Sequence, residues 1–242
     1  MKFSNLRLMT IAAAFVGAMA LAPFASAALV TGEANIAGTT TVSETSILFC
    51  STPSPCAFTV EAPNTGSFSG LASGTIDDLT GGPYSGPASV TDFATFVATA
   101  GTIDFDLTEI NPGTGGTAGC TSNTVGNTCT PTYSSGTIVS PFTLFQVGPN
   151  TVDISLDLSG VSYFNPPGKS GGTSPTLGGF TTQDLVTGTI TGILATINGG
   201  GSITDSYSAT FVSSVPEPTT AFLGLSGLLM AAGLYRRRNR KV

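Results

Sequence analysis

The stretch TVDISLDLSGVSYF, residues 151–164, alternates apolar and polar side chains with a period of two. A period of two is that of a β-strand with one buried face and one face toward solvent. The residues expected on the inner face are Val152, Ile154, Leu156 and Leu158, and those expected on the outer face are Asp153, Ser155, Asp157 and Ser159. The pattern therefore predicts a long strand with its apolar face in a core.

The same alternation recurs on either side of this stretch. In GTIDFDLTEI, residues 101–110, the expected inner residues are Ile103, Phe105 and Leu107, opposite Asp104, Asp106 and Thr108. Near the end of the body, the runs 184–197 and 202–214 flank the turn Asn-Gly-Gly-Gly at 198–201. Glycine in a turn permits positive φ, so these two runs are predicted to form a β-hairpin. Its second strand would place Tyr207, Ala209 and Phe211 on one face.

Several shorter apolar runs complete the strand pattern of the chain, and no helical repeat stands out between the two ends. The further strands are predicted at 32–42, 46–50, 57–61, 66–75, 94–100 and 140–147. Nine or ten short strands without crossover helices predict an all-β, antiparallel β-sandwich of jelly-roll type. A β-helix is the alternative, because Gly/Thr-rich chains can form one, although no fixed repeat is seen. The long loops, 111–136 and 165–179, are where a binding role is expected.

Charge is sparse and unevenly distributed. Only 9% of the 242 residues are charged, and the cations gather at the two ends. The span from Glu33 to Glu217 holds one lysine, Lys169, against all fourteen acids, which is a net charge of −13. Because phosphate binding depends on Lys and Arg, nucleic acid is excluded as a partner.

The first 27 residues, MKFSNLRLMTIAAAFVGAMALAPFASA, have the organisation of a secretory signal peptide. Two early cations precede an apolar run at 8–22, which is short for a membrane span. Small residues then precede the predicted cleavage site for signal peptidase, between Ala27 and Ala28. The remaining organisation is an exported domain at 28–214 and a separate tail.

That tail, VPEPTTAFLGLSGLLMAAGLYRRRNRKV at 215–242, combines three features. Two prolines flank Glu217 and keep the tetrapeptide extended, since proline cannot continue a helix. Residues 219–235 are uncharged and largely apolar, which predicts a transmembrane helix of minimal length. The basic tail at 236–242 is expected to stay in the cytoplasm. The residues alone leave open whether this is a cleaved signal or an uncut single-pass anchor.

The order and spacing of these features resemble the PEP-CTERM sorting signal of exported bacterial proteins. The residues that carry the resemblance are the sorting motif Val215, Pro216, Glu217 and Pro218, the apolar run to Tyr235, and the basic stop Arg236, Arg237 and Arg238. The resemblance implies an exosortase as partner, a transient inner-membrane intermediate, and delivery to the cell surface or extracellular matrix. It covers the last 28 residues and leaves the exported body unassigned.

Four cysteines, an even number in an exported chain, predict disulfides. They are Cys50, Cys56, Cys120 and Cys129. Three pairings are possible, and the simplest is the local one, Cys50–Cys56 with Cys120–Cys129. A zinc site is disfavoured because the spacings are unlike CxxC pairs and the chain has no histidine.

The absence of histidine excludes a Ser-His-Asp triad, a His-ligated zinc and a histidine general base. Paired carboxylates for glycoside hydrolysis are conceivable. The available acids are Asp104, Asp106, Glu109, Asp153 and Asp157. Their alternation is that of a solvent-facing strand surface, so we expect a protein that is not an enzyme and needs no cofactor. Asp104 and Asp106 are weak candidates for Ca²⁺.

Two functions follow as hypotheses. The first is a structural or adhesive protein of the cell surface or matrix, linked to exopolysaccharide and biofilm. The alternative is a secreted carbohydrate-binding module or glycan-acting enzyme, in which Tyr84, Tyr133 and Tyr163 would stack on sugar rings.

Overall fold

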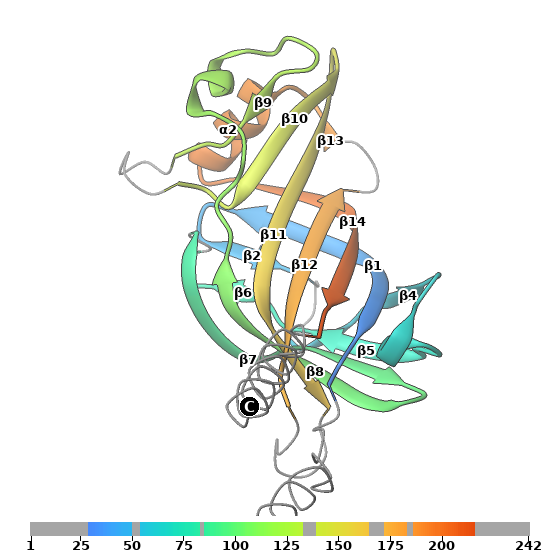
Figure 1. Ribbon diagram of the computed structural model, residues 1–242. Coiled ribbons are helices and arrows are strands. Elements are labelled where there is room, and N and C mark those ends of the chain that lie inside the picture. The colour runs from blue at the N-terminus through green and yellow to red at the C-terminus, as the bar shows by residue number, and fades with distance from the viewer. Residues whose placement is uncertain are drawn as a thin grey trace, which may run out of the picture.

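A computed structural model describes residues 29–49, 54–82, 85–132, 139–164, 172–182 and 186–215. Its strands join into one antiparallel sheet that curls round a core (Figure 1). The strands are β1 Gly32–Ser43, β2 Ser46–Leu48, β3 Cys56–Ala57, β4 Thr59–Glu61, β5 Ser73–Ile76, β6 Leu79–Thr80, β7 Gly86–Ala98, β8 Gly101–Ile110, β9 Thr128–Cys129, β10 Phe142–Gly148, β11 Thr151–Phe164, β12 Ser174–Thr182, β13 Val186–Thr187 and β14 Ser202–Ser213. The helices are η1 Gly66–Phe68, η2 Thr117–Thr121 and α2 Ile190–Asn198.

The strand order shows how the sheet curls. Along the main path it runs β3-β5-β7-β8-β11-β12-β14-β1-β2-β6. Although β5 and β6 lie toward opposite ends of this path, only Asp77 and Asp78 separate them in the chain. The two ends of the sheet are therefore brought together. The all-β prediction is confirmed, but a two-sheet sandwich is not confirmed, and the antiparallel pairing is unlike the parallel strands of the alternative, a β-helix.

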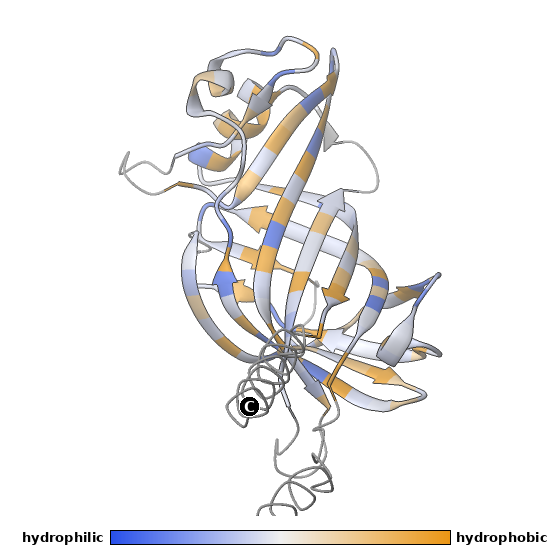
Figure 2. Ribbon diagram, viewed as in Figure 1, coloured by the Kyte–Doolittle hydropathy of each residue, from blue (hydrophilic) through white to orange (hydrophobic). Residues whose placement is uncertain are grey.

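The two strands that anchored the prediction, β8 and β11, pair side by side in the middle of the sheet. Their apolar positions face the core as expected, and Figure 2 shows the alternation of hydropathy along β11. One outer position differs from the prediction. Asp104 is 1% exposed, not solvent-facing, because it lies between Thr95 and Tyr163 of the flanking strands. The Thr95 hydroxyl donates a hydrogen bond to Asp104 Oδ1 at 2.9 Å.

Aromatic rings fill the inside of the curl. Phe211 of β14 lies at the centre of this cluster, with its ring centroid 5.1 Å from that of Phe96 and 5.3 Å from that of Phe105. Both contacts are edge-to-face, the geometry that aromatic quadrupoles favour. Strands from distant parts of the chain are thereby packed together around one core.

The predicted strand at 184–197 is wrong, because most of it forms the helix α2. The Thr189 hydroxyl caps the helix by accepting a hydrogen bond from the Gly192 amide at 3.2 Å. The buried side chains Ile190 and Ile193 lie three residues apart, which is a helical spacing. The predicted hairpin is consequently wrong too, since β14 pairs with β1 and β12 instead.

The first six residues of β12, 174–179, lie in the region 165–179 that the sequence predicted to be a loop. Its inner face carries Ser174, Thr176 and Phe180, which are all buried. Small and hydroxylated residues hide the alternation in this segment, and the glycine pair at its centre suggests a loop. Here a strand forms because β11 and β14 pair with it on both sides.

The disulfide between Cys120 and Cys129 is present and ties η2 to β9. This confirms one of the two predicted local pairs. Cys56 is also disulfide-bonded, and its predicted partner, Cys50, lies outside the described residues. The predicted signal peptide at 1–27, transmembrane helix at 219–235 and basic tail at 236–242 lie outside them as well. Among the described segments, we find no helix with the length and apolarity needed to cross a bilayer.

Candidate functional site

An apolar pocket of about 50 Å³ lies between α2 and the upper end of the curled sheet, and we call it the outer pocket. Figure 1 shows α2 above that end of the sheet, beside β10. The walls of the outer pocket include Ile193, Leu194 and Ile197 of α2, Phe142 of β10, Ile154 of β11 and Ile203 of β14. The helix that replaced the predicted strand therefore builds one wall of a pocket.

A second space of about 40 Å³, the inner pocket, borders the buried side chains Ile47 and Leu156 on the inside of the sheet. It shares Val42, Phe142, Ile154 and Ile203 with the outer pocket, so the two adjoin. Three aromatic side chains that line it are Phe49, Phe180 and Tyr207. The four shared side chains therefore lie between the outer pocket at α2 and the aromatic side chains of the inner pocket.

Tyr207 of β14 is the notable polar group of the inner pocket. Its side chain is 2% exposed, and its ring packs against Phe49 and Phe180 at centroid distances of 5.6 and 5.5 Å. It lies opposite Gly38 of β1, where an added Cβ would stand 2.8 Å from the tyrosine hydroxyl. Within the described part of the chain, that hydroxyl has no hydrogen-bond partner. Burial raises the pKa of Tyr207 well above its ordinary value, so the hydroxyl keeps its proton.

Two other polar residues of the inner pocket, Thr40 and Asp205, already make hydrogen bonds. The Thr40 hydroxyl donates to the Leu48 carbonyl at 3.1 Å, and Asp205 Oδ1 accepts from the Ser206 amide at 2.8 Å. Thr40 and Asp205 are register partners on β1 and β14. Tyr207 is therefore the residue of the inner pocket whose buried hydroxyl could donate a hydrogen bond to a ligand.

A second polar cluster joins β7, β8 and β11 through Asp92, Asp106 and Tyr163. The Tyr163 hydroxyl lies 2.6 Å from Asp92 Oδ1 and 3.0 Å from Asp106 Oδ1. The Asp92 amide donates to Asp106 Oδ1 at 2.7 Å, and Asp92 has a φ of 54° within the irregular part of β7. Burial foremost, and then the hydrogen bonds and charges of the two carboxylates, raise the pKa of Tyr163 far above its ordinary value. This cluster fastens the irregular segment of β7 to its neighbours.

The raised pKa of Tyr163 predicts a loss of stability in alkali. In the unfolded chain this hydroxyl ionises near pH 10, whereas in the folded chain it stays protonated to higher pH. The protonated Tyr163 hydroxyl therefore makes its full contribution to the free energy of unfolding below about pH 10. That contribution is lost as the pH rises above this value. We expect the free energy of unfolding, measured in urea between pH 8 and pH 12, to fall more steeply for the wild type than for Tyr163→Phe. Equal slopes would contradict this role of the hydroxyl.

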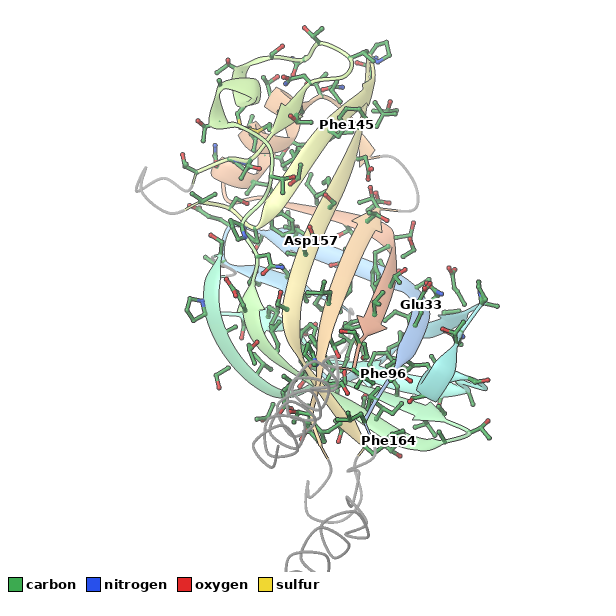
Figure 3. All side chains as sticks on the ribbon, viewed as in Figure 1. Glu33, Phe96, Phe145, Asp157 and Phe164 are labelled. Carbon is green, nitrogen blue, oxygen red and sulfur yellow. A yellow bond between two sulfur atoms is a disulfide. The ribbon has the colours of Figure 1, made fainter. Side chains whose placement is uncertain are left out.

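The other predicted site residues are not drawn into the pockets. Asp157 is exposed on the outer face of β11, as Figure 3 shows, and Glu109 is exposed on β8. Asp153 Oδ1 accepts a hydrogen bond from the Thr182 hydroxyl of β12 at 3.0 Å. The described residues contain no group of three or more His, Cys, Asp or Glu suited to a metal ion. The Ca²⁺ site at Asp104 and Asp106 stays a prediction.

The tyrosines expected to stack on sugars give a mixed result. Tyr163 is 3% exposed and held by two carboxylates, so its ring is not available for stacking. Tyr84 and Tyr133 lie outside the described residues. Sequence reasoning missed the pocket altogether. The signal that could have revealed it is the spacing of Ile190, Ile193 and Ile197, which suits one face of a helix.

Comparison with known proteins bears on the tail. The family model described as the PEP-CTERM protein-sorting motif matches residues 214–241. The chain carries a PEP-CTERM sorting motif. This motif implies export, processing by an exosortase and membrane-associated sorting to the cell surface. It confirms the resemblance drawn from the sequence, and it covers none of the curled sheet, because β14 ends at Ser213.

No curated protein and no solved structure matches the chain. Of the predicted sorting and cleavage residues, only Val215 lies within the described part, where it is exposed. The others lie outside it and are Ala27, Ala28, Pro216, Glu217, Pro218, Arg236, Arg237 and Arg238.

Proposed function

We propose that this protein is a structural or adhesive component of the cell surface or extracellular matrix, linked to exopolysaccharide, and that it is not an enzyme. The observation that carries the proposal is the PEP-CTERM motif at 214–241. Sorting to the surface places the curled sheet among the hydrated polymers that surround the cell.

The outer surface of the sheet supports an association with such polymers. It presents hydroxyl pairs across neighbouring strands, such as Thr41 with Thr204 at 2.8 Å and Thr181 with Ser208 at 3.3 Å. Hydroxyl groups both donate and accept hydrogen bonds, as sugars do. A surface with few charges and many hydroxyls suits many weak contacts with a polysaccharide.

The composition supports the non-enzymatic part of the proposal. With no histidine in the chain, the commonest general base and the usual triads are missing. The carboxylates that could replace them are engaged in the sheet, since Asp92 and Asp106 both contact the Tyr163 hydroxyl. Asp153 accepts a hydrogen bond from Thr182. The alternative, a carbohydrate-binding module, relied on three tyrosines to stack on sugars. The one that lies within the described residues, Tyr163, is buried.

The sorting part is tested by replacing Pro216, Glu217 and Pro218 with alanine. We expect the variant to accumulate in the inner-membrane fraction at full length and to be lost from the surface fraction, as measured by immunoblotting of separated fractions. Glu109→Gln is the matched control, because it also removes one acid but lies outside the sorting motif, on the exposed part of β8. Normal surface delivery of the triple variant would refute sorting through this motif.

The structural part has its own test. Wild-type protein released from the surface should co-sediment with exopolysaccharide extracted from the same bacterium, and bovine albumin serves as the control. A protein that reaches the surface but stays in the supernatant would contradict the exopolysaccharide link while leaving the sorting result intact.

A further inference from the structure

We propose that the outer and inner pockets together bind an uncharged aliphatic chain that carries a hydrogen-bond acceptor, such as an acyl ester. The proposal concerns the interior of the exported body and is independent of the sorting motif. It rests on the size and lining of the pockets, on Tyr207, and on the charge of the surroundings.

The space is too large and too apolar for one ordered water. A water molecule needs about 10–15 Å³ of such volume and two to four polar partners. The outer pocket has about 50 Å³ and the inner one about 40 Å³. Apolar side chains line most of the outer pocket, and its polar lining residues are Ser43, Thr132, Ser140 and Asn198. Water would therefore leave most of the wall without favourable contacts. Two small adjoining spaces suit a narrow chain of several carbons better than a ring.

Tyr207 supplies the polar end of the site. Its hydroxyl is buried, keeps its proton and lacks a partner within the described residues. Leaving such a donor unsatisfied costs free energy, and an acceptor on a bound molecule would remove that cost. Gly38 makes room for the tyrosine itself, since a Cβ at that position would be 2.8 Å from the hydroxyl, and Tyr207 is among the residues that line the inner pocket. The inner pocket is therefore the expected place for the acceptor of the ligand.

Charge selects an uncharged ligand over a fatty-acid anion. Asp205 lines the same inner pocket as Tyr207. The exported domain at 28–214 has one lysine against thirteen acids, so a cation to pair with a carboxylate is scarce. A buried carboxylate without a cation is costly. An ester or alcohol accepts the same hydrogen bond without that cost.

The outer pocket provides the entrance. Leu194 and Ile197 of α2 are half-buried, as are Val42 and Ile203 at the facing ends of β1 and β14. Apolar side chains that are partly exposed around a pocket mouth favour entry of an apolar chain. The alkyl part would lie against α2, with the acceptor directed inward.

The test uses the full chain in lipid nanodiscs and isothermal titration calorimetry, with empty nanodiscs as the blank for partition into lipid. The probes are methyl hexanoate and hexanoate. We expect saturable binding of the ester and at least tenfold weaker binding of the anion. Tyr207→Phe keeps the ring but removes the donor, and should weaken ester binding about fivefold, the equivalent of one hydrogen bond.

Two further variants complete the test. Leu194→Trp should block the outer pocket and abolish binding, whereas Tyr163→Phe removes a buried hydroxyl that lines neither pocket and should leave binding unchanged. Circular dichroism checks that each variant is folded. The proposal is overturned if hexanoate binds as tightly as the ester, or if Tyr207→Phe binds as the wild type does. It is overturned as well if the ester never saturates the protein.

Discussion

Replacing Phe211 with alanine is expected to lower the free energy of unfolding by about 3–5 kcal/mol, the usual cost of removing a buried phenylalanine. Phe211 is fully buried and sits where rings from three other strands meet. Its centroid lies 5.1 Å from Phe96, 5.3 Å from Phe105 and 5.6 Å from Phe180. The cavity left behind would remove packing from all three neighbours at once.

Phe145→Ala is the matched control, because it makes the same chemical change on β10, where the side chain is 39% exposed. Figure 3 shows Phe145 in the upper part of the molecule and Phe96 near the lower end of the sheet. We expect Phe145→Ala to lower the free energy of unfolding by less than about 1 kcal/mol, since surface substitutions usually have small effects. The measurement is urea denaturation followed by circular dichroism. Comparable losses for both variants would show that the aromatic cluster does not dominate stability.

The parts of the fold that the sequence predicts well are the strands with strong alternation. The runs at 101–110 and 151–164 became β8 and β11, and the run at 202–214 became β14. In each, apolar side chains of ordinary size mark the buried face, so local pattern and tertiary burial agree. The shared face of Tyr207, Ala209 and Phe211 is likewise buried as predicted.

The prediction failed where the local pattern was ambiguous. Residues 184–197 contain β-branched residues and glycines that suit a strand, but the capping Thr189 and the apolar spacing that follows favour the helix α2. For β12 the reason is different. Its inner face includes Gly178, which lies directly beneath the ring of Phe211, so a large apolar residue would not fit there.

The candidate pocket was beyond sequence reasoning for a further reason. Gly38 and Tyr207 are far apart in the chain, and only the register of β1 against β14 places them opposite each other. The walls also come from α2, β10 and β11, so no short motif marks the site. The sorting tail could be recognised because its motif is contiguous, with all of its features within the matched residues 214–241.

Replacing Gly160 with alanine is the second substitution with a large expected effect. On β11, an added Cβ would lie 2.1 Å from the Asp106 carbonyl oxygen and 2.6 Å from the ring of Phe105. The register between β8 and β11 shifts between Ser159 and Gly160, which accompanies this close approach of the two backbones. Because a backbone oxygen cannot move away as a flexible side chain can, the strands must separate locally.

We expect Gly160→Ala to lower the free energy of unfolding by about 3 kcal/mol or more, which is at the upper end of the effects of overpacking a core. Gly179→Ala on the neighbouring strand β12 is the matched control, because the nearest atom to its added Cβ is Asp157 Oδ1 at an ordinary 3.5 Å. Alanine there should be tolerated within about 1 kcal/mol, since it also restricts the unfolded chain. Thermal unfolding of the two variants measures the difference. If both lose stability equally, glycine is needed in these strands for flexibility, and the contact between β8 and β11 is not what requires Gly160.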